Sequence, residues 1–205
     1  MKVKVLITSL VLVSQVLTAQ HSFDQLKDAF TKSYELEAQG NYKQAAEVLS
    51  KVYLSNHYGI NLRLGWLFYM DGKFAISKQY YQRATELRPM SIEAYLGLVF
   101  PVSALGNWDE VLAIYQKILN IDPNHSLTNY RIGTLYYYRE DYRLAEQHLE
   151  KVVNMYPFDY DSLLMLGWTK YQLGKREEAA QLFRQALLNR PYDESAQQGL
   201  ELSTQ

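Results

Sequence analysis

A pattern of residues returns every 34 positions in this chain, and this period constrains the fold more than any single residue does. Gly72, Gly106, Glu140 and Gly174 are spaced 34 apart, and Gly40 stands 32 before Gly72. Seventeen residues after each of the four residues from Gly72 to Gly174 comes a proline, so four of the chain's five prolines follow the period: Pro89, Pro123, Pro157 and Pro191. A fixed period of this length indicates a stack of similar supersecondary units rather than one globular core.

The spacing inside each unit predicts two helices joined by a tight turn. Counted from the turn residue, positions 5, 9 and 12 share one face of the second helix, which we expect to pack inward. Position 9 is large and apolar or aromatic in every unit: Leu49, Tyr81, Tyr115, Leu149 and Phe183. Position 2 is aromatic at Tyr42, Phe74, Trp108 and Tyr142. We therefore expect Trp108 to be buried as part of the scaffold, and the prolines to end the second helices.

Over roughly residues 24–193 the pattern resembles the tetratricopeptide repeat (TPR) family. The segments 40–45, 106–111 and 174–179 match the family's turn and second-helix signature, and 120–124 and 189–193 match its closing segment. The resemblance implies an all-α fold, a right-handed α-solenoid of about five helix–turn–helix units with a C-terminal capping helix. We place the array at residues 20–193, in units of about 26–57, 58–91, 92–125, 126–159 and 160–193, and the capping helix at 194–205.

The N-terminus has the layout of a secretory signal. Lys2 and Lys4 precede an apolar run over 5–17, and Ala19 supplies a small residue for cleavage. The run is too short and too polar to predict a membrane span. The sequence therefore predicts removal of residues 1–19 and an exported protein, periplasmic or secreted, with no membrane span after cleavage. An amphipathic first helix of the domain is the alternative.

Composition and motifs argue against catalysis. The chain has no cysteine, which excludes disulfides, thiol chemistry and cysteine zinc sites. Its four histidines are scattered, and no phosphate loop, dinucleotide fingerprint or metalloprotease motif is present. The net charge of −1 gives no reason to expect a nucleic-acid partner. We predict no enzymatic activity, no catalytic residues, no cofactor and no metal site, and we interpret acidic pairs such as Glu177 and Glu178 as solvated surface charge.

The first helices carry an unusual number of aromatic residues on the face opposite the packing stripe. In proteins of the TPR type this face forms a concave groove, so the resemblance implies a ligand-binding groove with aromatic and arginine side chains. Its predicted residues are Tyr34, Arg63, Trp66, Tyr69, Phe100, Tyr130, Arg131, Tyr137, Trp168 and Tyr171. An extended apolar strip with polar edges generally marks a binding site.

Two alternatives apply to these residues. The aromatic rings could serve packing between neighbouring helices, because aromatic area is useful in cores and interfaces alike. Arg63 and Arg131 could fix the direction of a ligand, or they could be surface arginines paired with nearby acids. The basic clamp for a peptide's C-terminal carboxylate, found in chaperone-binding TPR proteins, looks absent because the companion lysine and asparagine are missing.

The sequence thus predicts a non-catalytic protein- or peptide-binding adaptor or scaffold of the cell envelope, with an extended partner segment in the groove. A glycan- or peptidoglycan-binding module is one alternative, since aromatic faces also stack on sugar rings. Assembly through the ends of the solenoid is another. The identity of the partner and the oligomeric state do not follow from the sequence.

Overall fold

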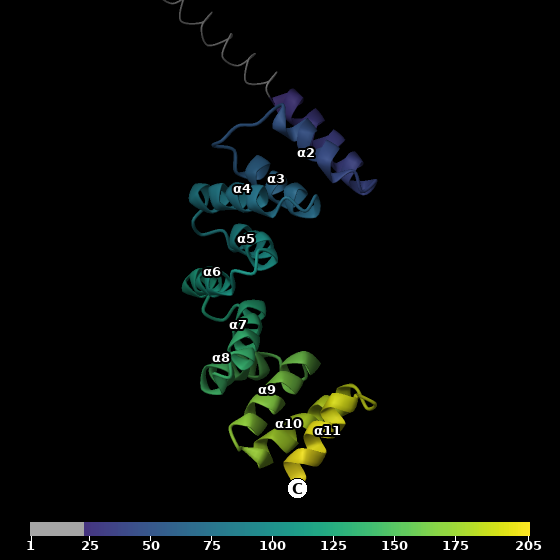
Figure 1. The fold of residues 1–205 in the computed structure, drawn as a ribbon, viewed down its shortest axis with the longest axis vertical. Helices are drawn as coiled ribbons and strands as arrows, with labels where there is room; N and C mark the ends of the chain where they lie inside the picture. The colour runs from purple at the N-terminus through teal and green to yellow at the C-terminus, as the bar shows by residue number, and fades with distance from the viewer. Residues whose placement is uncertain (1–22) are drawn as a thin grey trace, which may run out of the picture. The chain divides into compact units, whose positions relative to one another are not determined.

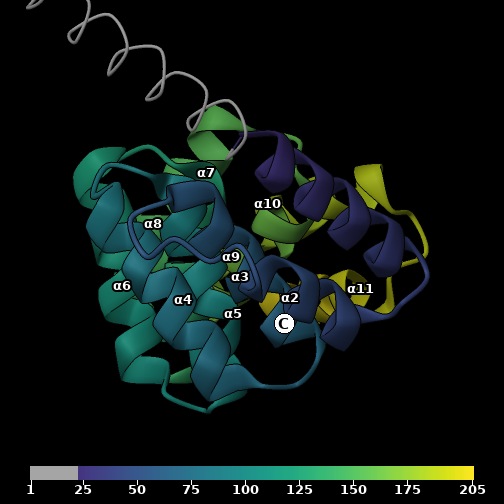
Figure 2. The same ribbon diagram turned by 90° about the horizontal axis from the view of Figure 1, so that it is seen from above.

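The computed structural model describes residues 23–205, and every regular element among them is a helix (Figures 1 and 2). The first described helix covers residues 23–38. The others are α2 (Tyr42–Ser50), α3 (Tyr58–Met70), α4 (Phe74–Leu87), α5 (Ile92–Ala104), α6 (Trp108–Ile121), α7 (Ser126–Tyr138), α8 (Tyr142–Met155), α9 (Tyr160–Gln172), α10 (Arg176–Asn189) and α11 (Glu194–Thr204). The all-α prediction is confirmed. The predicted signal segment, residues 1–19, lies outside the described residues.

The chain divides into two compact units that meet in sequence after Trp108, the first residue of α6. In the first unit α3 packs against α2, α4 and α5. In the second unit α9 packs against α8, α10 and α11 (Figure 1). Among residues 23–205, no helix is both long enough and apolar enough to cross a lipid bilayer.

The conformation of the turn residues explains why glycine recurs at this position of the repeat. Each tight turn places one residue in the left-handed region, where a side chain is disfavoured, and four of the five turns have Gly there, as with Gly72 at φ 73°. Gly72 N donates to the Tyr69 carbonyl and Lys73 N to the Phe68 carbonyl, which closes the end of α3. Glu140 adopts the same conformation at φ 63°, at a cost of roughly 1–2 kcal/mol for a residue with a Cβ.

The first helix of each later pair, and α11, begins at a side-chain cap, and the caps are also spaced 34 apart. In each case the capping side chain accepts a hydrogen bond from the backbone amide three residues on. The capping residues are His57, Ser91, His125, Asp159 and Asp193. Two of the four histidines therefore have a structural role that the sequence pattern did not assign to them.

The predicted packing stripe forms the core. At position 9 of the second helices, Leu49, Leu149 and Phe183 are fully buried, and Tyr81 and Tyr115 nearly so. Trp108 is different, because its side chain is 50% exposed, so the prediction that it is buried is wrong. Position 2 is the first residue of the second helix in a pair. A side chain there leans over the turn and is covered on one side only.

Two aromatic rings at position 9 fit between glycines of neighbouring helices. A Cβ added at Gly97 would lie 2.1 Å from the Tyr81 ring, and one at Gly65 would lie 2.8 Å from it. Phe183 is enclosed in the same way, since a Cβ at Gly199 or Gly167 would come within 2.4 or 2.8 Å of its ring. The helices approach closely because these glycines leave room for one large ring.

Candidate functional site

A groove of about 690 Å³ opens in the first unit and carries several of the predicted binding residues. Its walls come from the helix over residues 23–38, from α3 and from α5, and Tyr81 of α4 contributes as well. Tyr34, Arg63, Trp66 and Phe100 all line it. The first helices of three consecutive repeats therefore contribute to one groove, as expected from the shared face of their side chains.

Two rings that line this groove, Trp66 and Phe100, form a contiguous cluster with Tyr69, which is not itself among the lining residues. The ring centroids of Trp66 and Phe100 are 6.1 Å apart, those of Tyr69 and Phe100 are 5.3 Å apart, and those of Trp66 and Tyr69 are 6.0 Å apart. These spacings are typical of favourable aromatic pairs. Phe100 is nevertheless 44% exposed and Tyr34 is 53% exposed, so part of the aromatic surface is open to a ligand.

Glu37 holds the polar part of the groove in a fixed arrangement. Its carboxylate accepts a hydrogen bond from the Trp66 indole, with 2.5 Å between Nε1 and Oε1, and its second oxygen pairs with the Arg63 guanidinium. Burial opposes ionisation of Glu37, but the hydrogen bonds from Arg63 and Trp66 outweigh it and lower the pKa of this carboxyl. The indole ring of Trp66 is therefore fixed in orientation before any ligand arrives.

Arg63 occupies a different environment from the one expected of a ligand-directed arginine. Its side chain is largely buried, is paired with Glu37 and lies over the Tyr34 ring, with 4.0 Å between Cζ and the ring centroid. Of the two interpretations of this arginine, pairing with a nearby acid is the one the structure supports. Its charge is already neutralised, so Arg63 supports the groove wall rather than offering a free cation.

In the second unit, three predicted groove aromatics make internal contacts. Trp168 packs edge-on against the buried Phe183, at 5.1 Å between centroids, and its indole donates to the Ser195 hydroxyl of α11. Tyr171 meets the Trp168 ring at 5.8 Å, and Tyr137 meets the Tyr142 ring at 5.5 Å. These three residues are half-buried, and their contacts fit the packing interpretation.

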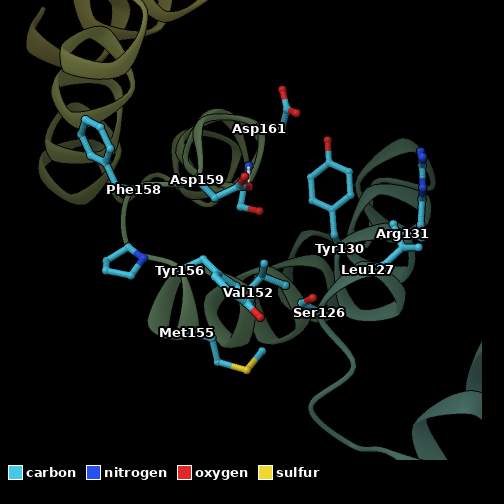
Figure 3. A pocket seen from close by; sticks show the side chains of 12 residues that line it. Ser126, Leu127, Tyr130, Arg131, Val152, Met155, Tyr156, Phe158, Asp159 and Asp161 are labelled. Carbon is cyan, nitrogen blue, oxygen red and sulfur yellow. Dashed lines mark hydrogen bonds between the residues drawn. The ribbon is translucent and has the colours of Figure 1, made fainter.

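Tyr130 and Arg131 line a pocket of about 720 Å³ in the second unit. Figure 3 shows both side chains projecting from α7 on one side of this pocket, with Phe158 of the α8–α9 turn on the other. The ten predicted residues thus occupy three settings: the groove of the first unit, with Tyr69 packed beside its lining, internal contacts of the second unit, and this pocket.

The repeats of this chain match those of a known protein family. A family model described as tetratricopeptide repeat matches residues 30–89 and 130–196, which together exceed half of the chain. The chain belongs to the TPR family. No curated protein sequence matches it significantly.

Solved structures of other TPR proteins share the fold. A TPR protein from Parabacteroides merdae is 21% identical, with a TM-score of 0.76 over 88% of this chain and 73% of that one. MamA from Desulfovibrio magneticus is 16% identical, with a TM-score of 0.70 over 83% and 98% of the two chains. YrrB, described as a TPR protein with an unusual peptide-binding site, is 14% identical, with a TM-score of 0.71 over 90% and 97%. Similarity at these identities shows the fold alone.

One charged cluster in the TPR array was missed by sequence reasoning. Lys170 is only 6% exposed, and its ammonium group lies 2.6 Å from Glu146, 2.5 Å from Glu150 and 2.6 Å from Glu178. Burial disfavours the charged lysine, but its hydrogen bonds to the three carboxylates outweigh this and raise the pKa of Lys170 above its ordinary value. Glu178 is 55% exposed, as expected of solvated surface charge, and it is in addition a counter-ion of the buried Lys170.

A signal for this cluster was present in the sequence. Four residues before the turn, the other repeats have apolar or aromatic residues: Leu36, Phe68, Val102 and Tyr136. Lys170 stands at the same position in the last repeat, and a charge at a repeat position that is otherwise apolar predicts a partner of opposite charge. The three glutamates lie within 4.8 Å of one another, and the lysine neutralises part of their charge.

Proposed function

We propose that this TPR protein is a non-catalytic adaptor that binds an extended segment of a partner protein in the groove of its first unit. The observation that carries the proposal is a groove built by three successive first helices, lined by Trp66 and the partly exposed Phe100. The Tyr69 ring packs against both of these rings. YrrB, which shares the fold, is described as having a peptide-binding site, and this supports the class of ligand.

The arrangement of the groove suits a peptide with large apolar side chains. Aromatic rings supply contact area at a low cost in conformational entropy, and such residues dominate binding energy at protein interfaces. The Glu37 carboxylate keeps Trp66 in one orientation, so less freedom is lost when a ligand binds. Glu93 adds an exposed carboxylate to the same groove, which gives a bound segment a polar contact at one edge.

Replacing Phe100 by alanine tests the groove with little risk to the fold, because this ring is 44% exposed. Peptides selected from a random phage-displayed library on the wild-type protein provide the probes. We expect F100A to weaken their binding by about 2 kcal/mol, or roughly thirtyfold, since truncation of a central contact aromatic commonly costs this much. Calorimetric titration measures the affinity, and circular dichroism checks that the helical signal is retained.

Ile76 supplies the matched control for this experiment. It is a 40% exposed apolar residue of the same unit, on α4, and it is absent from the lining of the groove. Ile76→Ala should bind the selected peptides as the wild type does. Peptides that bind F100A and the wild type equally well would show that the groove aromatics serve packing and that the binding site lies elsewhere.

We further propose that the adaptor acts in the cell envelope, as a periplasmic or secreted protein. The support is the basic, apolar and small-residue layout of residues 1–19. Intact-mass measurement on protein from the native host tests this, and the expected mass corresponds to a chain beginning at Gln20. A mass that includes residues 1–19 would contradict export by signal cleavage.

A further inference from the structure

The pocket of the second unit is lined by an arginine, Arg131, that has no carboxylate partner among residues 23–205. It is bounded by α7, the end of α8, the turn that follows, and the start of α9 (Figure 3). We propose that this pocket is a second binding site, which takes an acidic segment of a partner protein. In this site a large apolar side chain of the segment enters the pocket, and an aspartate or glutamate side chain beside it pairs with Arg131.

The apolar part of the pocket is unusually open. Leu127, Met155, Tyr156 and Phe158 are 46%, 38%, 53% and 57% exposed, and all four line the same cavity. Large apolar side chains that are exposed singly are common, but a group of them around one concavity generally marks an interaction site. The pocket therefore favours a partner side chain that is apolar and large.

The turn that carries Phe158 is held in place without a ligand. Asn189 of α10 donates a hydrogen bond to the Phe158 carbonyl, with 2.7 Å between Nδ2 and O. The next residue, Asp159, caps α9 through a 3.0 Å hydrogen bond from the Ser162 amide. Because hydrogen bonds hold both Phe158 and Asp159, the apolar lining is largely formed before a ligand binds.

The charged residues of the pocket differ in whether they already have a partner within the protein. Asp159 is engaged in capping α9, and Asp161 has Arg190 at 4.0 Å as a counter-charge. Arg131 is exposed, lies near the Tyr130 ring at 5.9 Å, and has no carboxylate partner among the described residues. Arg131 is thus the charged lining residue that has neither a hydrogen-bonding partner nor a counter-ion among the described residues, and a ligand group that pairs with it would be acidic.

The first unit shows what an arginine at this repeat position binds. Arg63 and Arg131 both stand nine residues before their turns. Arg63 pairs with the carboxylate of Glu37, which lies three residues before the turn of the preceding repeat. Arg131 has no such carboxylate among the described residues, so by analogy with Arg63 the carboxylate that pairs with it would come from the partner.

The test uses capped nine-residue peptides with a central tryptophan and one glutamate placed one to four residues away on either side. Acetyl and amide caps remove the terminal charges, so the glutamate side chain is the only carboxylate. Calorimetric titration against the full chain is expected to find binding for at least one spacing. Arg131→Glu should weaken that peptide at least about tenfold, because it replaces an ion pair with a like-charge contact. A lysine in place of the peptide glutamate should restore binding to R131E.

Arg184→Glu is the matched control, since Arg184 is an exposed arginine of the same unit, on α10, outside the pocket. We expect R184E to bind as the wild type does, and F100A as well, because Phe100 belongs to the groove of the first unit. Phe158→Ser should weaken the same peptide while circular dichroism shows a folded chain. Equal loss in R184E and R131E would reduce the effect to overall charge and overturn the proposal. Absence of binding at every spacing, or unchanged binding by R131E, would also overturn it.

Discussion

Replacing Phe183 by alanine is expected to lower the free energy of unfolding by about 3–5 kcal/mol, the range for deleting a fully buried aromatic ring. Phe183 has no exposed surface, lies against Trp168, and fills the space beside Gly167 and Gly199. Gly167 and Gly199 have no side chain that could move into the cavity left by the ring. Urea denaturation followed by circular dichroism measures the change.

Trp108→Ala is the comparison for Phe183→Ala, because position in the repeat alone would make both residues part of the scaffold. With half of its side chain exposed, Trp108 should contribute about 1 kcal/mol or less on truncation. A loss for W108A as large as that for Phe183→Ala would show that position 2 of the repeat is part of the core after all.

The second large effect is expected at Lys170. Replacing it by alanine leaves the partly buried Glu146 without its closest counter-ion and removes a charge shared by three carboxylates. Loss of one member of a buried ion pair is strongly destabilising, and we expect about 3 kcal/mol because Glu150 and Glu178 retain access to water. Lys175→Ala is the control: Lys175 also pairs with Glu146 but is 41% exposed, so its loss should cost about 1 kcal/mol or less.

The same network gives the Lys170 prediction a pH signature. Burial opposes ionisation of Glu146, but hydrogen bonds from Lys170 and Lys175 lower its pKa below 4.5 in the folded state. Its contribution to stability is therefore present above pH 4.5 and is lost as the pH falls through the folded value. The gap in urea midpoint between wild type and Lys170→Ala should be largest near neutral pH and narrow below pH 4.5. A gap that does not change with pH would assign the effect of Lys170 to packing of its alkyl chain.

Much of the fold could be predicted from the sequence because the repeat fixes local geometry and packing together. A glycine in four of the five turns, as at Gly72, supplies the left-handed conformation, and the residues at position 9, such as Leu49 and Phe183, fall on the inward face of a helix. Both features depend on spacing along one chain segment. They follow from the 3.6-residue period of the helix and need no knowledge of distant contacts.

The candidate site was predicted only in part, because the role of a side chain there depends on residues from other repeats. Trp66 and Phe100 do line a groove, whereas Trp168, at the equivalent position to Trp66, packs on Phe183 and donates a hydrogen bond to Ser195 of α11. Lys170 was overlooked because its three partners lie on α8 and α10 and only folding brings them together.

The sequence by itself determined the all-α repeat architecture, the turns and the core, because these depend on residue type at a fixed period. The tertiary structure decided which charged side chains are paired inside the protein and which are exposed. Arg63 and Arg131 are indistinguishable by repeat position, yet the first is buried against Glu37 and the second is exposed, with no carboxylate partner among the residues that the structure describes. The free energy of an ionised side chain is set by its solvation and by charges within a few ångströms. These surroundings come from neighbouring helices, so the period of the sequence does not specify them.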